Sequence, residues 1–318
     1  MGVFILLFGI LIASVLLLLL AGTFGCYRYV FVVGKRANTD PHVMLPGEQY
    51  AERKEEILRL VDEALAIPYT DVYTVSHDGY RLHGRYYETA PGAPVEIQVH
   101  GYKSMAIRDF AGGLQLALSA GHNVLLIDQR AHGESEGRCL TFGVLERRDC
   151  LSWVNWLRER NGEAVRILLV GVSMGAATVL MAAGLPLSEN VVGVVADSAY
   201  TSPKEIICKV IRDRRLSPAL VYPFVRLGAR LFGRFDLEEG SAETALKAAR
   251  VPVLFIHGEA DRFVPCDMSR ANYAACGSEK RLLTVTEAGH GLGCLVDGAA
   301  YREALDWLFS EALYVENC

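Results

Sequence analysis

From residue 95 onward the chain repeats one pattern, in which a short run of aliphatic residues is followed by a turn and then by a stretch with helical periodicity. Such runs are typical of central parallel strands, because helices cover both faces of the sheet. Their alternation with helices predicts βαβ units and therefore a doubly wound α/β sheet. The predicted strands of this series are residues 95–99, 124–127, 167–170, 191–196, 253–256 and 282–285.

Two further strand-like runs precede this series. Residues 72–76 and 81–87 flank Asp78-Gly79, a dipeptide that favours a tight hairpin turn. The hairpin predicts an antiparallel edge and brings the expected sheet to eight strands, most of them parallel. Helices are expected over residues 49–66, 110–120, 145–158, 174–185 and 301–313.

One segment breaks the alternation. Between residues 201 and 249 only helix-like pieces occur, such as 206–212 and 219–231. An insertion after the carboxyl end of a strand in an open α/β sheet lies over the ligand crevice. We therefore expect a short helical lid, with a lengthened ordinary crossover as the alternative. Four apolar residues of the segment either line an apolar site or simply pack: Leu220, Val221, Phe224 and Leu231.

The amino-terminal segment is apolar enough to enter a membrane. No charged residue occurs from Gly2 to Tyr27, and these 26 residues would form a helix of about 39 Å at about 1.5 Å per residue. A hydrocarbon core is about 30 Å thick, so we expect one transmembrane helix that is retained as an anchor. A cleaved signal peptide is one alternative, although no Lys or Arg precedes the apolar run. A lipoprotein signal is another, because residues 23–26 loosely resemble a lipobox.

Charge and cysteine usage favour a cytoplasmic location for the bulk of the chain. Arg28, Lys35 and Arg36 follow the apolar segment and no cation precedes it, which by the positive-inside rule places the bulk of the chain in the cytoplasm. The eight cysteines form no CxxC pair, as expected of free thiols in a reducing compartment. The expected organisation is an anchor at residues 1–33, a linker and amphipathic helix at 34–68, and the α/β domain at 69–318.

A candidate nucleophile lies after the third strand of the series. The sequence Gly-Val-Ser-Met-Gly at residues 171–175 follows the run 167–170 and opens a predicted helix. This is the pattern G-x-S-x-G, in which a sharp, strained strand-to-helix turn exposes the serine hydroxyl. Gly171 and Gly175 lack a Cβ, so strand and helix can approach closely. The pattern identifies Ser173 as the candidate nucleophile.

A serine nucleophile needs a base, and the base needs a group that orients it. Asp261 follows the run 253–256, and His290 follows the run 282–285 between two glycines. Both therefore lie at carboxyl ends of strands, on the same edge of the sheet as Ser173. The chain order Ser, acid, His is the order expected for a G-x-S-x-G serine.

Taken together, these motifs are similar to those of the α/β-hydrolase superfamily. The chain resembles the serine aminopeptidase-like members with a single N-terminal membrane anchor, and the similarity covers residues 71–313. The segments that carry it are H-G-Y-K at 100–103, D-Q-R-A-H-G-E-S at 128–135, G-V-S-M-G at 171–175, H-G-E-A-D-R-F-V-P at 257–265 and A-G-H-G at 288–291.

The resemblance implies a role for each residue of the site. Ser173 would be the nucleophile, His290 the general base and then acid, and Asp261 the carboxylate that orients His290. It also implies an oxyanion hole formed by the backbone N–H groups of Tyr102 and Met174. Such donors stabilise a transition state by about 3–4 kcal/mol each. The helix that begins at Met174 adds a favourable dipole.

Other polar residues near the motifs compete for these roles. Glu259 and Asp197 are rival acids, and Asp197 is otherwise expected to hold the lid through loop hydrogen bonds. His100 and His257, which lie beside glycines at strand ends, are expected to be structural hydrogen-bonding residues. Loop-organising or packing roles are expected for Arg130, His132, Phe263, Pro265, Met105, Met181 and Met268.

Composition and missing motifs exclude several functions. The net charge of −5 and the pI near 5.9 lack the basic surplus of a nucleic-acid-binding protein. The sequence contains no H-E-x-x-H, Cys–His cluster or Walker P-loop, so we expect no metal, nucleotide or other cofactor. A serine at the nucleophile position argues against dehalogenases and epoxide hydrolases, whose relatives on this fold use Asp there.

These observations predict a membrane-anchored serine hydrolase that cleaves an ester or thioester through an acyl-enzyme. The substrate would be a small molecule or an acyl chain near the bilayer, and no obligate protein partner is expected. An aminopeptidase or amidase, an acyltransferase on the same triad, and a catalytically silent anchored scaffold are the alternatives. Fold alone does not choose among the substrates.

Overall fold

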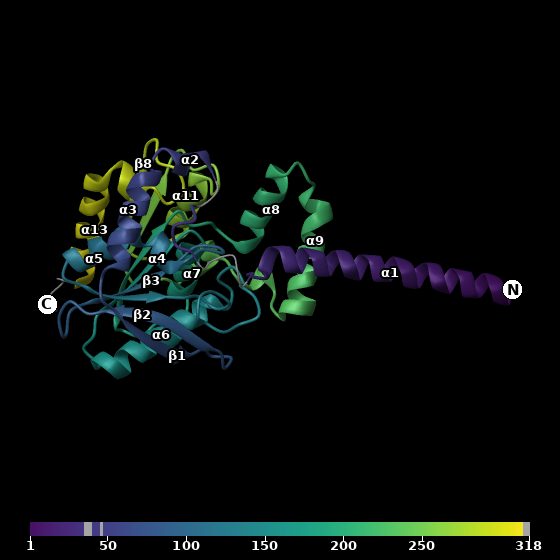
Figure 1. Cartoon of the computed structure of the whole chain (residues 1–318), viewed down its shortest axis with the longest axis horizontal. Coiled ribbons are helices and arrows are strands. Elements are labelled where there is room, and N and C mark those ends of the chain that lie inside the picture. The colour runs from purple at the N-terminus through teal and green to yellow at the C-terminus, as the bar shows by residue number, and fades with distance from the viewer. Residues whose placement is uncertain (35–39, 45–46, 314–318) are drawn as a thin grey trace.

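The computed structural model describes residues 1–34, 40–44 and 47–313, and its centre is one sheet of eight strands (Figure 1). The strand order is β1-β2-β4-β3-β5-β6-β7-β8. β1 pairs antiparallel with β2 and β2 with β4, whereas all other neighbours are parallel. The predicted doubly wound, mostly parallel sheet is therefore confirmed. The strands are β1 Thr70–Val75, β2 Arg81–Tyr87, β3 Val95–Val99, β4 Asn123–Ile127, β5 Ile167–Val172, β6 Val191–Asp197, β7 Val253–Gly258 and β8 Lys280–Val285.

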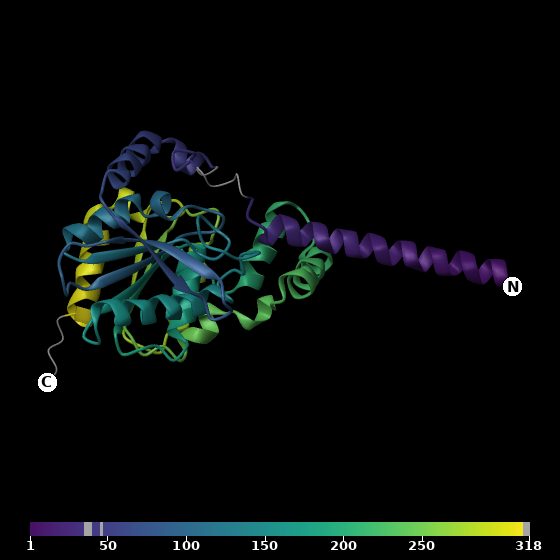
Figure 2. The same cartoon turned by 60° about the horizontal axis from the view of Figure 1, so that its bottom comes forward.

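Helices cover both faces of the sheet (Figure 2). On one face lie α6, α7 and α11, and on the other lie α5 and α13, with α3 packed on the outer side of α5. This arrangement explains the aliphatic runs, since every residue of β3, β4 and β7 is buried. The helices named here are α3 Lys54–Leu65, α5 Ala111–Ser119, α6 Glu146–Asn161, α7 Met174–Ala183, α11 Cys266–Ala275 and α13 Gly298–Leu313.

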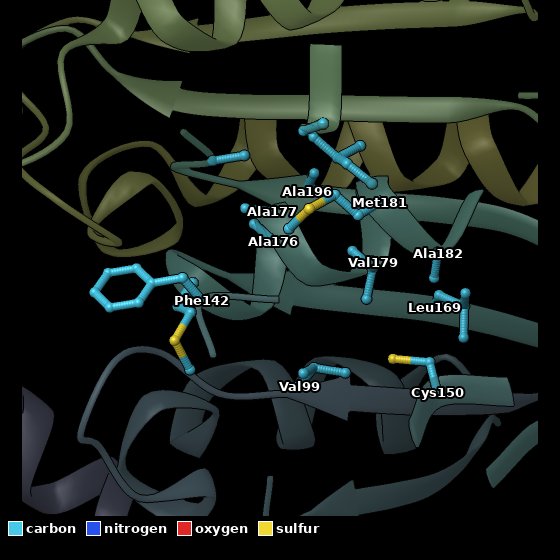
Figure 3. Packing of buried hydrophobic residues seen from close by; sticks show 14 of the residues in the cluster. Val99, Phe142, Cys150, Leu169, Ala176, Ala177, Val179, Met181, Ala182 and Ala196 are labelled. Carbon is cyan, nitrogen blue, oxygen red and sulfur yellow. The ribbon is translucent and has the colours of Figure 1, made fainter. Parts of the chain in front are cut away.

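The largest part of the core lies between the sheet and α7. Figure 3 shows Val179 and Ala182 of α7 in one cluster with Leu169 of β5 and Val99 of β3. Small residues on α7 let the helix approach the strands, and all ten of its residues are buried. The nucleophile turn is thus built on the most deeply buried helix of the domain.

The prediction of one continuous helix over residues 49–66 is wrong. The structure has α2 Glu48–Ala51 and then α3, with Arg53 in a non-helical conformation between them. The break redirects α2, so that Tyr50 is buried, while Val61 and Ala64 of α3 pack toward α5. Leu65, the last residue of α3, is 38% exposed. Asn38, Leu45 and Pro46 of the expected linker lie outside the described residues.

The insertion at residues 201–249 contains helices and no strand, as predicted. One of its two longest helices, α9, packs against α1 rather than on the sheet. The helices α4 and α12, one turn each, were not expected. The bounds are α8 Pro203–Asp213, α9 Pro218–Gly228, a π-helical turn η1 Ala229–Gly233, a 3-10 turn η2 Leu237–Glu239, α10 Ala242–Leu246, α4 Ala106–Asp109 and α12 Gly293–Val296.

The amino terminus forms one straight helix, α1 Gly2–Phe31, that projects from the domain (Figure 1). Among the described residues it is the only helix long and apolar enough to cross a membrane. Its 30 residues span about 45 Å at about 1.5 Å per residue. Arg28 is exposed in its last turn, whereas Lys35 and Arg36 lie outside the described residues. The seven described cysteines are free thiols, and Cys318 falls beyond that part of the chain.

Candidate active site

Ser173 occupies a sharp turn between β5 and α7. Its backbone has φ 57° and ψ −117°, a left-handed conformation that L-residues rarely adopt. The turn depends on the two glycines, because a Cβ on Gly175 would lie 1.8 Å from the Val99 carbonyl oxygen. A Cβ on Gly171 would lie 2.3 Å from the Gly175 carbonyl oxygen. The strand–turn–helix geometry predicted from the motif is therefore present.

Asp261 and His290 are joined directly. The His290 ring contacts Asp261 Oδ2 through Nδ1 at 2.6 Å, and both side chains are buried. The other carboxylate oxygen accepts the backbone N–H groups of Phe263 and Val264 at 2.8 and 2.9 Å. These bonds fix the carboxylate, so that Nδ1 of the ring carries the proton and Nε2 is left as a base.

A second histidine supports the same carboxylate. His257 approaches Asp261 Oδ2 with Nε2 at 3.2 Å, and its Nδ1 contacts Ser269 Oγ at 2.6 Å. Burial alone would raise the pKa of Asp261, but the hydrogen bonds from His257 and His290 hold it well below its usual range. Asp261 is therefore an anion at neutral pH, and His257 has the structural role expected from the sequence.

Ser173 and His290 line the same cavity, at the carboxyl edge of the sheet. Ser173 Oγ has no hydrogen-bond partner within the described parts of the chain, and a Cβ on Gly101 would lie only 3.8 Å from it. Catalytic contacts are often loose in a ligand-free site and tighten when substrate binds. Phe263, expected to be a packing residue, is 42% exposed and sets its ring against His290 at 5.2 Å.

The two amides expected to form an oxyanion hole lie beside Ser173. Met174 is the first residue of α7, so its N–H has no acceptor inside the helix. Tyr102 lines the cavity, and its N–H donates to no group of the described chain. Asp109 positions this loop, because its Oδ2 accepts the Gly101 N–H at 2.8 Å and its Oδ1 accepts the Ser104 hydroxyl. Sequence reasoning missed Asp109, which belongs to no recognisable motif.

The cavity has a volume of about 420 Å³ and extends from Ser173 along the face of the sheet. Its floor is formed by strands β3, β5 and β6, and its walls by α5 and α13. Leu60 and Ile57 of α3, together with Tyr50 of α2, close it from above. Most of its surface is apolar. The apolar lining includes Val170 and Val172 on the floor and Gly112, Leu116, Leu305 and Phe309 on the walls.

The expected lid does not cover this cavity. No residue from 201 to 249 is among those that line it, although all of that segment is described. The segment instead packs beside α1, as helix α9 does. The cover comes from α2 and α3, which the sequence suggested only as an amphipathic helix. Gln49 Oε1 accepts the His290 N–H at 3.2 Å, and Tyr50 donates its hydroxyl to the His290 carbonyl at 3.1 Å.

The rival acids have other partners. Glu259 is exposed and pairs with Arg270 at 3.3 Å, away from His290. Asp197 lies on the cavity wall, where its carboxylate accepts the hydroxyls of Ser198 and Tyr301 at 2.9 and 3.4 Å. The expectation that Asp197 holds the insertion is therefore wrong. Burial raises the pKa of its carboxyl group.

The remaining polar residues of the motifs organise loops, as expected. His100 accepts the Gln129 N–H at 3.1 Å through Nε2, and its ring lies 4.7 Å from that of His132. Arg130 forms hydrogen bonds to both carboxylate oxygens of Asp149 and of Asp78. His77, Asp78 and Asp149 have the spacing of a metal site, but the Arg130 cation already lies on the two carboxylates.

Comparisons with known proteins agree with this fold. A family model described as "Alpha/beta hydrolase family" matches residues 99–304. The uncharacterized protein YqkD of Bacillus subtilis (strain 168) is 27% identical over 229 residues, which cover 71% of this chain and 74% of that protein. The uncharacterized protein YfhR of Escherichia coli O157:H7 is 27% identical over 198 residues, 61% of this chain and 63% of that protein.

Solved structures resemble the chain in fold. An esterase from Pyrococcus furiosus superposes with a TM-score of 0.63 at 24% sequence identity, covering 79% of this chain and 94% of that one. An identity this low bears on the arrangement of the elements and not on the substrate.

Proposed function

The chain belongs to the alpha/beta hydrolase family, and on that premise we propose that it is a serine hydrolase that cleaves carboxylic ester or thioester bonds. One observation carries the proposal: the His290 ring is fixed by Asp261 in the cavity that Ser173 lines. A nucleophile, a base and an orienting carboxylate are the three groups that acyl transfer to serine requires.

The reaction follows from these three groups. Ser173 Oγ attacks the acyl carbon while His290 Nε2 accepts its proton, and the oxyanion receives hydrogen bonds from the Tyr102 and Met174 N–H groups. The C–O or C–S bond then breaks, and the leaving group takes the proton from His290. Water, deprotonated by His290, attacks the acyl-enzyme, which releases the carboxylic acid and returns the proton to Ser173. Esters and thioesters are favoured because their leaving groups depart more easily than an amine.

The cavity supports an acyl chain as the substrate group next to the scissile bond. Val170 and Val172 on its floor, with Leu305 and Phe309 on its wall, present aliphatic and aromatic surface. Its volume of about 420 Å³ lies within the range of small-molecule sites. Apolar surface of this kind binds hydrocarbon by the hydrophobic effect.

Labelling with a fluorophosphonate probe tests the nucleophile. We expect the probe to label the wild-type chain and not Ser173→Ala, because the substitution removes the reactive hydroxyl. The same substitution should lower kcat by on the order of 10⁶-fold. The matched control is Ser310→Ala, an exposed serine on α13, which should label like the wild type. A folded wild-type protein that does not label would contradict the proposal and favour a non-catalytic scaffold.

A panel of p-nitrophenyl esters and aminoacyl amides of different acyl length tests the bond and the acyl site. Gly112→Leu should narrow the cavity and reduce kcat/KM for long chains more than for acetate, since a Cβ at Gly112 meets only Leu60 Cδ1, at 3.7 Å. Leu116→Ala should have the opposite effect. Amides cleaved faster than esters, or transfer to an added alcohol dominating in water, would replace the hydrolase assignment by an amidase or an acyltransferase.

We also propose that α1 is a retained single-pass anchor and that the catalytic domain lies in the cytoplasm. Arg28 in the last turn of α1 supports this orientation, as do Lys35 and Arg36, which follow the helix in the sequence. Protease added to intact cells should leave the domain whole. Digestion from outside would place it on the other side of the membrane.

A further inference from the structure

Helix α9 and the turns at its two ends carry an unexplained apolar stripe. Leu216, Leu220, Leu227 and Leu231 are 51%, 71%, 45% and 53% exposed. Leu220 and Leu227, seven residues apart, lie on one face of α9, while Leu216 precedes the helix and Leu231 lies in the π-helical turn that follows it. The opposite face of α9 packs inward, since Tyr222 and Val225 are buried. Four exposed leucines along one helix and its two ends mark a contact surface, because exposed apolar groups on a soluble surface are normally scattered.

This surface is not part of the substrate cavity. None of the four leucines lines the cavity at Ser173, although all four belong to the described chain. The insertion was expected to form a lid, and two of these leucines were expected to line a site or to pack. Because Leu220 and Leu231 neither line the cavity nor pack inside the domain, we look for another partner that covers this surface.

The position of α9 beside α1 indicates that occupant. The two helices cross closely at Gly228, where a Cβ would lie 2.9 Å from the Thr23 carbonyl oxygen and 3.0 Å from Tyr27 Cβ. Beyond the crossing, the Phe232 ring lies 5.1 Å from that of Phe24. Figure 1 shows α9 running across α1, with α8 on the side of the catalytic domain and the apolar part of α1 projecting from the other side.

The charge of this region is opposite to that of the whole chain. Residues 203–233 contain seven Lys or Arg and two Asp or Glu, a formal charge of +5, in a chain whose net charge is −5. Several of these cations pair internally, as Arg226 and Arg230 do with Asp236. Arg212, Arg214 and Arg215 at the turn between α8 and α9 are exposed. Within the described chain these three arginines form no ion pair, although Arg214 donates to the Tyr29 hydroxyl at 2.7 Å. Positive charge is therefore concentrated next to Leu216 and Leu220.

We propose that this leucine stripe and the three arginines of the turn form a seat on an anionic bilayer, with α9 lying at the boundary between headgroups and acyl chains. An amphipathic helix with leucines on one face and basic residues beside it binds membranes in this way. Basic residues close to the surface add attraction to anionic lipids. The stripe is continuous with α1, whose residues 3–20 are exposed and apolar, so one bilayer covers both.

The seat changes how the catalytic domain meets the membrane. A single helix would leave the domain free to pivot on a tether, whereas a transmembrane helix and an interfacial helix locked together at Gly228 hold it in one orientation. The insertion is thus a second membrane attachment and not a cover for the cavity. The inference concerns the membrane contact and does not depend on which bond Ser173 cleaves.

Photo-crosslinking of the full chain in phosphatidylglycerol-containing vesicles tests the seat. A photoreactive p-benzoylphenylalanine is placed at Leu220 or Leu231, at Leu11 of α1 as the positive control, and at Leu65 as the matched negative control. Leu65 is a 38% exposed leucine at the end of α3, a helix that Figure 1 shows in the part of the domain away from the projecting end of α1. We expect lipid adducts at Leu220, Leu231 and Leu11, and none at Leu65.

Lipid adducts at Leu11 alone would overturn the proposal, as would adducts at Leu220 that join two protein chains. The charge is tested separately with the double variant Arg212→Gln, Arg215→Gln. It should reduce the Leu220 lipid adduct severalfold in anionic vesicles and leave it unchanged in phosphatidylcholine vesicles. An unchanged yield in anionic vesicles would contradict the role of the arginines. Each variant is first shown to unfold at the wild-type temperature, so that a lost adduct reports membrane contact.

Discussion

The two parts of α1 belong to one continuous helix and meet different surroundings. Residues 2–22 include no buried residue, whereas residues 23–31 bury Thr23, Tyr27 and Phe31 at a spacing of four. Phe31 is fully buried, between the rings of Phe142 and Phe235. The outer part of the helix is therefore free to be solvated by lipid, while the inner part is hydrophobic core of the catalytic domain.

The backbone of the inner part is satisfied by the domain as well. The last carbonyl groups of a helix have no partner within it. Here Lys103 Nζ donates to the Tyr29 carbonyl at 2.7 Å, and the Tyr102 hydroxyl donates to the Val30 carbonyl at 2.7 Å. The Leu140 N–H donates to the Phe31 carbonyl at 3.0 Å. Apolar sequence alone therefore does not mark where an anchor ends, because the boundary between the exposed residues 2–22 and the packed residues 23–31 lies inside one continuous helix.

The largest expected effect comes from replacing a phenylalanine in the inner part of α1 and comparing it with the same replacement in the outer part. Phe31→Ala should lower the free energy of unfolding of the catalytic domain by about 3–5 kcal/mol, because it removes a buried ring from the core. Phe8→Ala is the matched control, since Phe8 is 56% exposed on the outer part and should leave domain unfolding unchanged. Denaturant unfolding in detergent measures both. Equal effects of the two substitutions would show that the inner part is not core.

The next effect compares a glycine that packs against the inner part of α1 with a glycine in the outer part. Gly228→Ala introduces a Cβ 2.9 Å from the Thr23 carbonyl oxygen, so α9 must shift away from α1, and we expect a loss of about 1–3 kcal/mol. Gly22→Ala is the control: a Cβ there meets no atom within 4 Å, and alanine favours a helix by up to about 1 kcal/mol. The unfolding temperature should therefore fall for Gly228→Ala and stay the same or rise for Gly22→Ala. A stabilised Gly228→Ala protein would contradict the close crossing.

The sheet and the triad geometry were open to prediction because their signals are local. A buried parallel strand is an aliphatic run, and the nucleophile turn requires glycines at Gly171 and Gly175, which are visible in sequence. Asp261 and His290 could be located because carboxyl ends of parallel strands share one edge of the sheet. The topology therefore brings Asp261 and His290 to the edge of the sheet that holds Ser173, although they follow Ser173 by 88 and 117 positions in the sequence.

The cover of the site and the seat of α9 were not predictable in the same way. Gln49 contacts His290 across 241 positions, and no periodicity or motif signals such a contact. The leucines of the insertion fit a lid, a core or a lipid surface equally well in sequence. Only the crossing at Gly228, which depends on how α1 leaves the domain, separates these possibilities.

The smallest expected effect links the inner part of α1 to the catalytic site. Tyr102→Phe removes the hydrogen bond to the Val30 carbonyl, which should cost about 0.5–1.5 kcal/mol of unfolding free energy. Because the proposed oxyanion donor is the Tyr102 N–H, a looser residue 102 should also lower kcat a few-fold and leave KM unchanged. Tyr29→Phe is the control, since among the described residues the exposed Tyr29 hydroxyl is hydrogen-bonded to Arg214 alone, at 2.7 Å. If Tyr102→Phe matched this control in both unfolding and kcat, the helix end and the oxyanion loop would be independent, and the inner part of α1 would be core without bearing on catalysis.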